Sequence, residues 1–306
     1  MATLAIVTVI NCAVANAGES VLQPISITSV PACNPGSGER AVESPLVVPV
    51  QAKSAALAPD RNAVLRDELV WTFGGKQQRG WYLYEELIYR LLDLANQRRP
   101  DVASGRFRQA VARWQTKVGL NPSGWLDETT LEVMIKEWQG RRLKDRTVAQ
   151  PAQLLTAPAS DYYDPARAVE LRQVEARAYA AYKRLIVAAA ADRSLGLKRQ
   201  GKGELAPAEK YLKIISSFRS RDYQEKLRRE SPQSGTAGLA VNSPHFTGRA
   251  LDLYVGGQPV DTSDANRAIQ VRGPVYKWLV RNAQRFGFQP YFYEPWHWEY
   301  VGDAKP

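Results

Sequence analysis

The sequence predicts an α+β protein in which a small helical domain precedes an α+β domain with a short antiparallel sheet. Between residues 83 and 135, apolar residues recur at helical spacing. Between residues 211 and 302, helical stripes alternate with segments rich in β-branched and aromatic residues. Irregular stretches rich in proline, alanine and serine precede and separate the two regions, which favours separate domains.

The first 17 residues predict a signal peptide, and therefore export. They are largely apolar and end in Ala-Asn-Ala, which is typical of a cleavage site, but they lack the usual lysine or arginine, so an unstructured N-terminal segment is the alternative. Residues 18–62 have no sustained period and predict a flexible linker. No segment is long and apolar enough to predict a stable membrane span.

The composition limits the classes of function. The chain has a net charge of +10 and a pI near 9.6, which favours polyanionic surroundings. No lysine- or arginine-rich tract is interleaved with aromatic residues, so nucleic acid is not an expected partner. The two cysteines, Cys12 and Cys33, form no Cys-x-x-Cys motif, which argues against a thiolate metal site.

Residues 63–142 predict the helical domain, because each expected helix has an apolar stripe. The stripes consist of Leu83, Leu87, Leu91 and Leu94; of Phe107, Val111 and Trp114; and of Leu131, Met134 and Ile135. Ser104 precedes the second helix, Gly119 is a plausible C-cap for it, and Asp127 or Glu128 begins the third.

The second half of this region resembles the peptidoglycan-binding domain found beside many bacterial cell-wall hydrolases. The residues that carry the resemblance are Phe107, Ala110-Val111, Trp114-Gln115, Gly119-Leu120, Gly124 and the acidic and threonine stretch from Asp127 to Thr130. The motif is moderately specific, and an unrelated helical bundle is the alternative. The resemblance implies that this region binds cell-wall polymer.

Residues 143–167 predict a linker, and residues 168–303 predict the α+β domain. The expected elements are a helix at 169–186 with the stripe Leu171, Val174, Ala178, Tyr182 and Leu185; a strand within 211–218; a helix at 221–230; a strand at 249–255; a helix at 273–287 with the stripe Val275, Trp278, Leu279 and Phe286; and aromatic strands at 288–301. Pro274 at the first turn and Gly287 at the end mark the last helix.

This domain holds both histidines of the chain, His245 and His297. A catalytic zinc takes three ligands from His, Asp, Glu and Cys and keeps one position for water, and a nearby carboxylate can accept the proton of that water. Asp252 and Glu294 complete such a set. Considered one at a time, residues of these types more often have a structural role or are exposed to solvent. The alternative for Glu294 and Glu299 is a carboxylate at the rim of the site, outside the reaction.

The local sequence indicates how these residues meet. Asp252 lies on an alternating strand and points away from the apolar face, so it reaches His245 only if the chain bends at Gly248. Pro295 interrupts regular pairing, so we expect Glu294 in a loop and His297 at the start of the last strand. The aromatic residues that share one face there are expected to be mainly core residues; they are Trp296, Trp298 and Tyr300.

Two motifs carry a specific family resemblance. Ser-x-His-x-x-Gly-x-Ala-x-Asp spans 243–252 and Glu-x-Trp-His spans 294–297. They resemble the zinc-dependent D-alanyl-D-alanine carboxypeptidases of the vancomycin-resistance type, whose relatives include D-Ala-D-Ala dipeptidases and phage L-alanyl-D-glutamate endopeptidases. The resemblance implies that one Zn²⁺ per chain is bound by His245, Asp252 and His297, and that Glu294 is the catalytic base.

A third segment, Ser-Ser-Phe-Arg-Ser-Arg-Asp-Tyr-Gln, resembles a segment that lies upstream in this family. It implies that Arg219 polarises the scissile carbonyl and stabilises the oxyanion, a role suited to a fixed guanidinium. Gln224, and Ser243 of the first motif, are weaker candidates for substrate contact or for support of the site.

The sequence thus predicts an exported zinc peptidase of the periplasm or cell wall that acts on peptidoglycan stem peptides. The expected reaction is removal of the terminal D-Ala, as in a D,D-carboxypeptidase. Two alternatives stay open. One is an endopeptidase that cuts within or between stems, and the other is a non-catalytic wall-binding protein, although none of the four expected site residues is missing.

Overall fold

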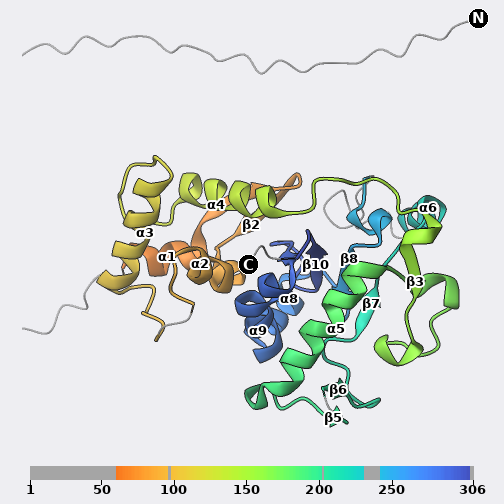
Figure 1. The fold of residues 1–306 in the computed structure, drawn as a ribbon. Coiled ribbons are helices and arrows are strands. Elements are labelled where there is room, and N and C mark those ends of the chain that lie inside the picture. Colours follow the sequence, from red (N-terminus) through yellow and green to blue (C-terminus); the bar gives the residue numbers. More distant parts are fainter. Residues whose placement is uncertain (1–59, 96–97, 202, 231–241, 304–306) are drawn as a thin grey trace, which may run out of the picture. The chain divides into compact units, whose positions relative to one another are not determined.

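The computed structural model describes residues 60–95, 98–201, 203–230 and 242–303 (Figure 1). The predicted signal peptide at 1–17 and nearly all of the predicted linker at 18–62 lie outside the described residues. The described residues all belong to one compact unit. Among the described residues, no helix has the length and apolar character needed to cross a membrane.

The region from 61 to 141 contains the predicted helices. Its elements are α1 (Arg61–Glu68), β1 (Val70–Phe73), β2 (Lys76–Arg79), η1 (Tyr82–Tyr84), α2 (Glu85–Leu91), α3 (Gly105–Lys117) and α4 (Glu128–Arg141). The side chain of Ser104 caps α3 by accepting a hydrogen bond from the Phe107 amide, and Asp127 caps α4 through the Thr130 amide. The break expected at Ser104 and the helix start expected at Asp127 or Glu128 are therefore confirmed.

A short hairpin, β1–β2, is an addition that the sequence analysis did not anticipate. Val70 pairs with Arg79 and Phe73 with Lys76 across a two-residue turn. The turn residues Gly74 and Gly75 have φ angles of 58° and 76°, a left-handed conformation that glycine adopts without strain and that matches the twist of a hairpin. A Gly-Gly pair directly after the β-prone residues 70–73 was the local signal for it.

The chain between α4 and the long helix α5 (Ala176–Ala191) is more structured than a linker. It contains η2 (Pro151–Gln153), β3 (Leu154–Thr156), η3 (Ala159–Asp161), η4 (Val169–Leu171) and β4 (Gln173–Glu175), with β3 antiparallel to β4. The prediction of an α-helix from residue 169 was wrong for residues 169–175. Val174 lies in β4, and the Glu175 side chain accepts a hydrogen bond from the Ala178 amide and so caps α5.

A four-stranded antiparallel sheet forms the centre of the C-terminal region, as predicted. Its strands are β7 (Ile214–Ser216), β8 (Ala250–Leu253), β9 (Phe288–Pro290) and β10 (His297–Tyr300), in the order β7-β8-β10-β9. The other elements are η5 (Arg193–Leu195), β5 (Arg199–Gln200), β6 (Glu204–Leu205), α6 (Arg221–Glu230), η7 (Pro244–Thr247), α8 (Asp264–Arg272), α9 (Pro274–Asn282) and η8 (Ala283–Phe286). Of these, the strands β5 and β6 and the helix α8 were not predicted.

One hydrophobic cluster runs through both predicted regions. The ring of Phe292, just before β10, lies 4.7 Å from that of Phe73 in β1 and 5.9 Å from that of Trp138 in α4. Arg267 of α8 is 1% exposed and donates a hydrogen bond to the hydroxyl of Tyr84. The helical region and the sheet region therefore share a core, while their separate functions stay predictions.

The Gln115 side chain in α3 yields a stability test. It is 1% exposed and makes hydrogen bonds to loop 123–125 and to Thr130. Gln115→Met keeps the size but leaves buried polar groups unpaired, so we expect the free energy of unfolding to fall by about 2–4 kcal/mol. Urea denaturation measures this. The control Gln109→Met, at an exposed position of α3, should change stability by less than about 0.5 kcal/mol; equal effects of the two variants would contradict the expectation.

Candidate metal centre

The register between β8 and β10 brings two of the predicted metal ligands together. His297 lies directly opposite Asp252 in the antiparallel pair. Side chains opposite each other in such a pair project from the same face of the sheet, about 4.5–5.5 Å apart at their Cβ atoms. Accordingly, Nδ1 of His297 lies 2.9 Å from Oδ1 of Asp252. Two ligands separated by 45 residues in the chain are thus placed by strand pairing alone.

The third predicted ligand, His245, lies in the 3-10 helix η7. The Ser243 side chain accepts a hydrogen bond from the His245 amide, and Gly248 ends the turn with a φ of 65°. A Cβ atom at Gly248 would lie 2.7 Å from a side-chain carbon of Leu154 and 2.9 Å from the amide nitrogen of Glu175. The bend predicted at Gly248 is confirmed, and the position requires glycine for its conformation and for the close approach of β3 and β4.

The ring of His245 has a defined orientation. Its Nδ1 lies 2.6 Å from the carbonyl oxygen of Ser217, and because a carbonyl only accepts, Nδ1 carries the proton. Nε2 then presents its lone pair to Asp252, whose Oδ2 lies 3.3 Å away. A histidine held through one nitrogen by a backbone carbonyl is the usual arrangement of a metal ligand.

The three side chains fit a single metal ion. One ligand atom from each of His245, Asp252 and His297 lies within 4.8 Å of the others, and all three residues are buried. In a tetrahedral zinc site with bonds of about 2.0 Å, ligand atoms are about 3.3 Å apart. Here Nε2 of His245 lies 3.3 Å from Oδ2 of Asp252, and Nδ1 of His297 lies 2.9 Å from Oδ1 of the same carboxylate. Two imidazoles and one carboxylate also leave a position for water, as in catalytic zinc sites.

The electrostatics of the cluster depend on compensation between buried charges. Burial, together with the charge of Arg219, lowers the pKa of His245 to about 4, so its ring is neutral. Burial opposes ionisation of Asp252, but the two histidines and Arg219 hold its pKa well below the ordinary value. Burial likewise opposes protonation of His297, yet hydrogen bonds to Asp252 and Glu299 raise its pKa to about 9. A metal ion therefore competes with a proton on Nδ1 of His297.

Arg219 lies directly against this cluster. Its Nη2 donates to Oδ2 of Asp252 at 2.7 Å, and its Nε donates to the hydroxyl of Ser216 at 2.9 Å. Gln224, 1% exposed at the start of α6, accepts a hydrogen bond of 3.4 Å from Nη1 of Arg219. Arg219 thus contacts the predicted ligand Asp252 directly, and Gln224 contacts Arg219. The hydroxyl of Ser243 accepts a hydrogen bond from the backbone amide of His245.

Glu294 lies in the turn before β10, as predicted, and β10 begins at His297. The backbone amide of His297 donates to the carbonyl of Glu294 at 2.9 Å. The Glu294 side chain is 7% exposed, and burial raises its pKa to about 8, although the positive charge of His297 opposes the shift. A carboxyl with a pKa near neutrality can both accept and return a proton.

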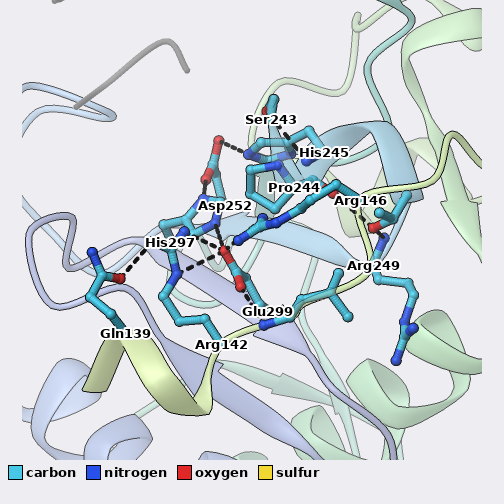
Figure 2. A network of polar contacts seen from close by, with 12 residues as sticks. Gln139, Arg142, Arg146, Ser243, Pro244, His245, Arg249, Asp252, His297 and Glu299 are labelled. Atoms are coloured by element: carbon cyan, nitrogen blue, oxygen red, sulfur yellow. Dashed lines mark hydrogen bonds and ion pairs between the residues drawn. The ribbon is translucent and has the colours of Figure 1, made fainter. Parts of the chain in front are cut away.

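The structure adds a residue that sequence reasoning missed. Glu299 is fully buried, so it is not a rim carboxylate, and its Oε1 lies 3.1 Å from Nε2 of His297 (Figure 2). The signal for this contact was the spacing of two on a strand, which places both side chains on one face. Its other side-chain partners are Arg142, the last residue of the predicted helical domain, and Arg146 in the predicted linker, and neither had such a signal.

The C-terminal region thus combines an α+β fold with a candidate mononuclear metal centre. Residues 172–303 match the family model of VanY, described as D-alanyl-D-alanine carboxypeptidase. This segment belongs to the VanY family of peptidoglycan peptidases. The match begins after the helical region, whose predicted binding role it does not address. No curated protein matches the chain.

Three solved structures are similar to part of the chain. The LdcB LD-carboxypeptidase is 23% identical, with a TM-score of 0.35 over 50% of this chain and 70% of its own. A vancomycin resistance D,D-pentapeptidase VanY in complex with Zn(II) is 22% identical, with a TM-score of 0.30 over 51% of this chain and 86% of its own. VanYB in complex with D-alanine-D-alanine is 24% identical, with a TM-score of 0.28 over 42% of this chain and 72% of its own.

The raised pKa of Glu294 makes the stability of the metal-free protein depend on pH. Its folded-state pKa of about 8 exceeds the ordinary value, so between about pH 5 and pH 8 the native state holds a proton that the unfolded chain has lost. Stability therefore falls as pH rises through this window. Glu294→Gln removes the titration and should raise the free energy of unfolding at pH 8 by roughly 2–4 kcal/mol, with little change near pH 5.

Urea denaturation in the presence of a chelator, at several pH values, measures this effect. Glu132→Gln, at an exposed position of α4, is the matched control and should follow the wild-type profile. A Glu294→Gln profile parallel to that of the wild type would show that Glu294 is ionised in the native state.

Proposed function

We propose that the protein is a zinc-dependent peptidoglycan peptidase, and specifically a D,D-carboxypeptidase that removes the terminal D-Ala of stem peptides. One observation carries the proposal: His245, Asp252 and His297 converge within the segment that belongs to the VanY family. The metal, the reaction and the roles of single residues are part of the proposal. The buried carboxyl of Glu294 in the adjacent turn supports it.

One zinc ion per chain would be held by Nε2 of His245, a carboxylate oxygen of Asp252 and Nδ1 of His297. This set suits zinc because imidazole nitrogens and a carboxylate oxygen are common zinc ligands and the site keeps a position for water. When bound, zinc supplies Lewis acidity, which makes a water molecule acidic near neutral pH and polarises a carbonyl.

Glu294 is the proposed catalytic base. Its carboxylate accepts the proton of the attacking water and returns it to the amine of the departing D-Ala, as the amide bond breaks. The divalent charge of a bound zinc would lower its pKa from about 8, which favours the carboxylate form that the first step requires.

Arg219 is the proposed stabiliser of the oxyanion. Its guanidinium is fixed by Asp252 and Ser216, and a fixed cation beside the ligands is suited to negative charge that develops on the substrate carbonyl oxygen. Gln224 and Ser243 were predicted to contact substrate or support the site. Their contacts with Arg219 and with the His245 amide favour support.

Export and wall binding complete the proposal. The helical region would bind cell-wall polymer, and the net charge of +10 would favour retention on anionic wall material. The segment that predicts export lies outside the described residues, so the periplasm or cell wall is proposed from the predicted signal peptide and from the peptidoglycan-directed family. Nucleic acid is not a proposed partner.

An assay with purified stem peptides tests the reaction. The zinc-loaded protein should release free D-Ala from a pentapeptide muropeptide and leave a tetrapeptide, and a chelator should abolish release until zinc is restored. Mass spectrometry identifies the products. Cleavage within the stem would make the protein an endopeptidase, and release of D-Ala from the tetrapeptide would make it an L,D-carboxypeptidase.

The base is tested by Glu294→Gln. This variant should retain zinc, because Glu294 is not a proposed ligand, and should lose about 10²–10⁴-fold in kcat/KM for D-Ala release. Glu132→Gln on the surface of α4 is the control and should keep wild-type kinetics. Hydrolysis by Glu294→Gln at the wild-type rate would remove Glu294 as the base, and a wild-type protein that binds muropeptides without cleaving them would favour the non-catalytic alternative.

A further inference from the structure

The carboxylate of Glu299 is placed beside a proposed metal ligand by the strand that carries both. Glu299 follows His297 by two positions in β10, so both side chains project from the same face. Ala250 lies opposite Glu299 in β8, and its small side chain leaves room for the carboxylate. Oε1 of Glu299 lies 3.1 Å from Nε2 of His297, and the Glu299 side chain has no exposed surface.

The other partners of Glu299 come from the chain just after α4. Nε of Arg142 donates to Oε1 at 3.0 Å, and Nη2 of the same guanidinium forms an ion pair with that oxygen. The backbone amide of Leu143 donates to Oε2 at 2.9 Å, and Nη1 of Arg146 approaches Oε1 at 3.4 Å. Both carboxylate oxygens are therefore occupied by donors that are more than 150 positions away in the sequence.

Arg142 itself is held on two further sides. Its Nη1 donates to Oε1 of Gln139, in the last turn of α4, at 2.8 Å. Its guanidinium carbon lies 3.9 Å from the centre of the Tyr291 ring. Figure 2 shows the resulting chain of contacts, from Gln139 through Arg142 and Glu299 to His297. The position of the carboxylate is thus fixed from α4 as well as from β10.

We propose that Glu299 is a positioning residue for the proposed metal ligand His297. Arg142, the last residue of the predicted wall-binding region, and Leu143, which follows it, hold Glu299 in place. The proposal rests on the proposed function, because it concerns the same metal centre. It makes the end of α4 part of the peptidase site rather than the last turn of a separate module.

The tautomer of His297 gives the physical reason. An ionised carboxylate only accepts hydrogen bonds, so Nε2 of His297 must carry a proton in this contact, and Nδ1 is the nitrogen directed to Asp252. A carboxylate on the far nitrogen fixes the ring and makes the ligating nitrogen a stronger donor to the metal. The carboxylate in turn needs positive partners, because a buried charge without them is costly.

Zinc affinity of the purified full-length protein tests the role without any assay of hydrolysis. Competition with a chromophoric chelator should show 10- to 100-fold weaker zinc binding for Glu299→Gln, the range typical of lost partners of ligating histidines. Arg142→Gln should weaken zinc binding in the same direction. The double variant should match Glu299→Gln alone, because Arg142 acts on the metal only through Glu299.

Two controls and one spectrum separate positioning from a loss of structure. Glu132→Gln and Arg141→Gln make the same chemical changes at exposed positions of α4 and should bind zinc like the wild type. The visible absorption of the cobalt-loaded protein reports the geometry around the metal. It should change in Glu299→Gln and Arg142→Gln but stay unchanged in both controls, even if a control shifts the denaturation midpoint.

The outcomes distinguish the two proposals. If the wild-type protein binds neither zinc nor cobalt, the proposed function fails, and the positioning role fails with it. If the wild type binds zinc, and Glu299→Gln and Arg142→Gln bind it with unchanged affinity and an unchanged cobalt spectrum, the metal centre stands and the positioning role is overturned. If Glu299→Gln does not fold, Arg142→Gln decides, since it leaves β10 and all three ligands intact.

Discussion

The antiparallel pairing of β8 with β10 is the constraint on which the rest of the site depends. Its register sets Asp252 opposite His297 and Ala250 opposite Glu299, so that these two proposed ligands share a face and the Glu299 carboxylate has space. A slip by one residue would turn these side chains to the opposite face of the sheet. The bend at Gly248 and the turn at Glu294 then bring the remaining groups to a position that the strands already define.

Charges of opposite sign alternate through the buried part of the site. Arg219 contacts Asp252, Asp252 contacts His297, His297 contacts Glu299, and Glu299 contacts Arg142. Each buried charge is tolerable only because the next one compensates it, since removing a single partner leaves an isolated ion in a medium of low polarity. The same logic connects the helical region to the sheet, because the last cation of the series comes from the end of α4.

Local signals made most of the fold predictable, and long-range contacts account for what was missed. The capped helices α3 and α4 and the strand that carries Asp252 follow from residues adjacent in sequence. The apolar residues at helical spacing continue through Val174, so nothing in the sequence indicated the strand β4 before α5. Such a stripe does not show where pairing with another strand, here β3, replaces a helix. At the site, the two histidines were conspicuous because the chain has no others, whereas Glu299 was not, because its burial depends on Arg142.

The order of strands in the central sheet has a consequence for how the protein is made. β10 comes last in sequence among the four strands, yet it lies between β8 and β9. As the nascent chain emerges from the ribosome, β9 has no partner and the cluster lacks His297 until residues 297–300 appear. The pocket that would bind metal is therefore assembled only after β10 has been synthesised, and a nascent chain that stops before β10 lacks one of the three proposed ligands.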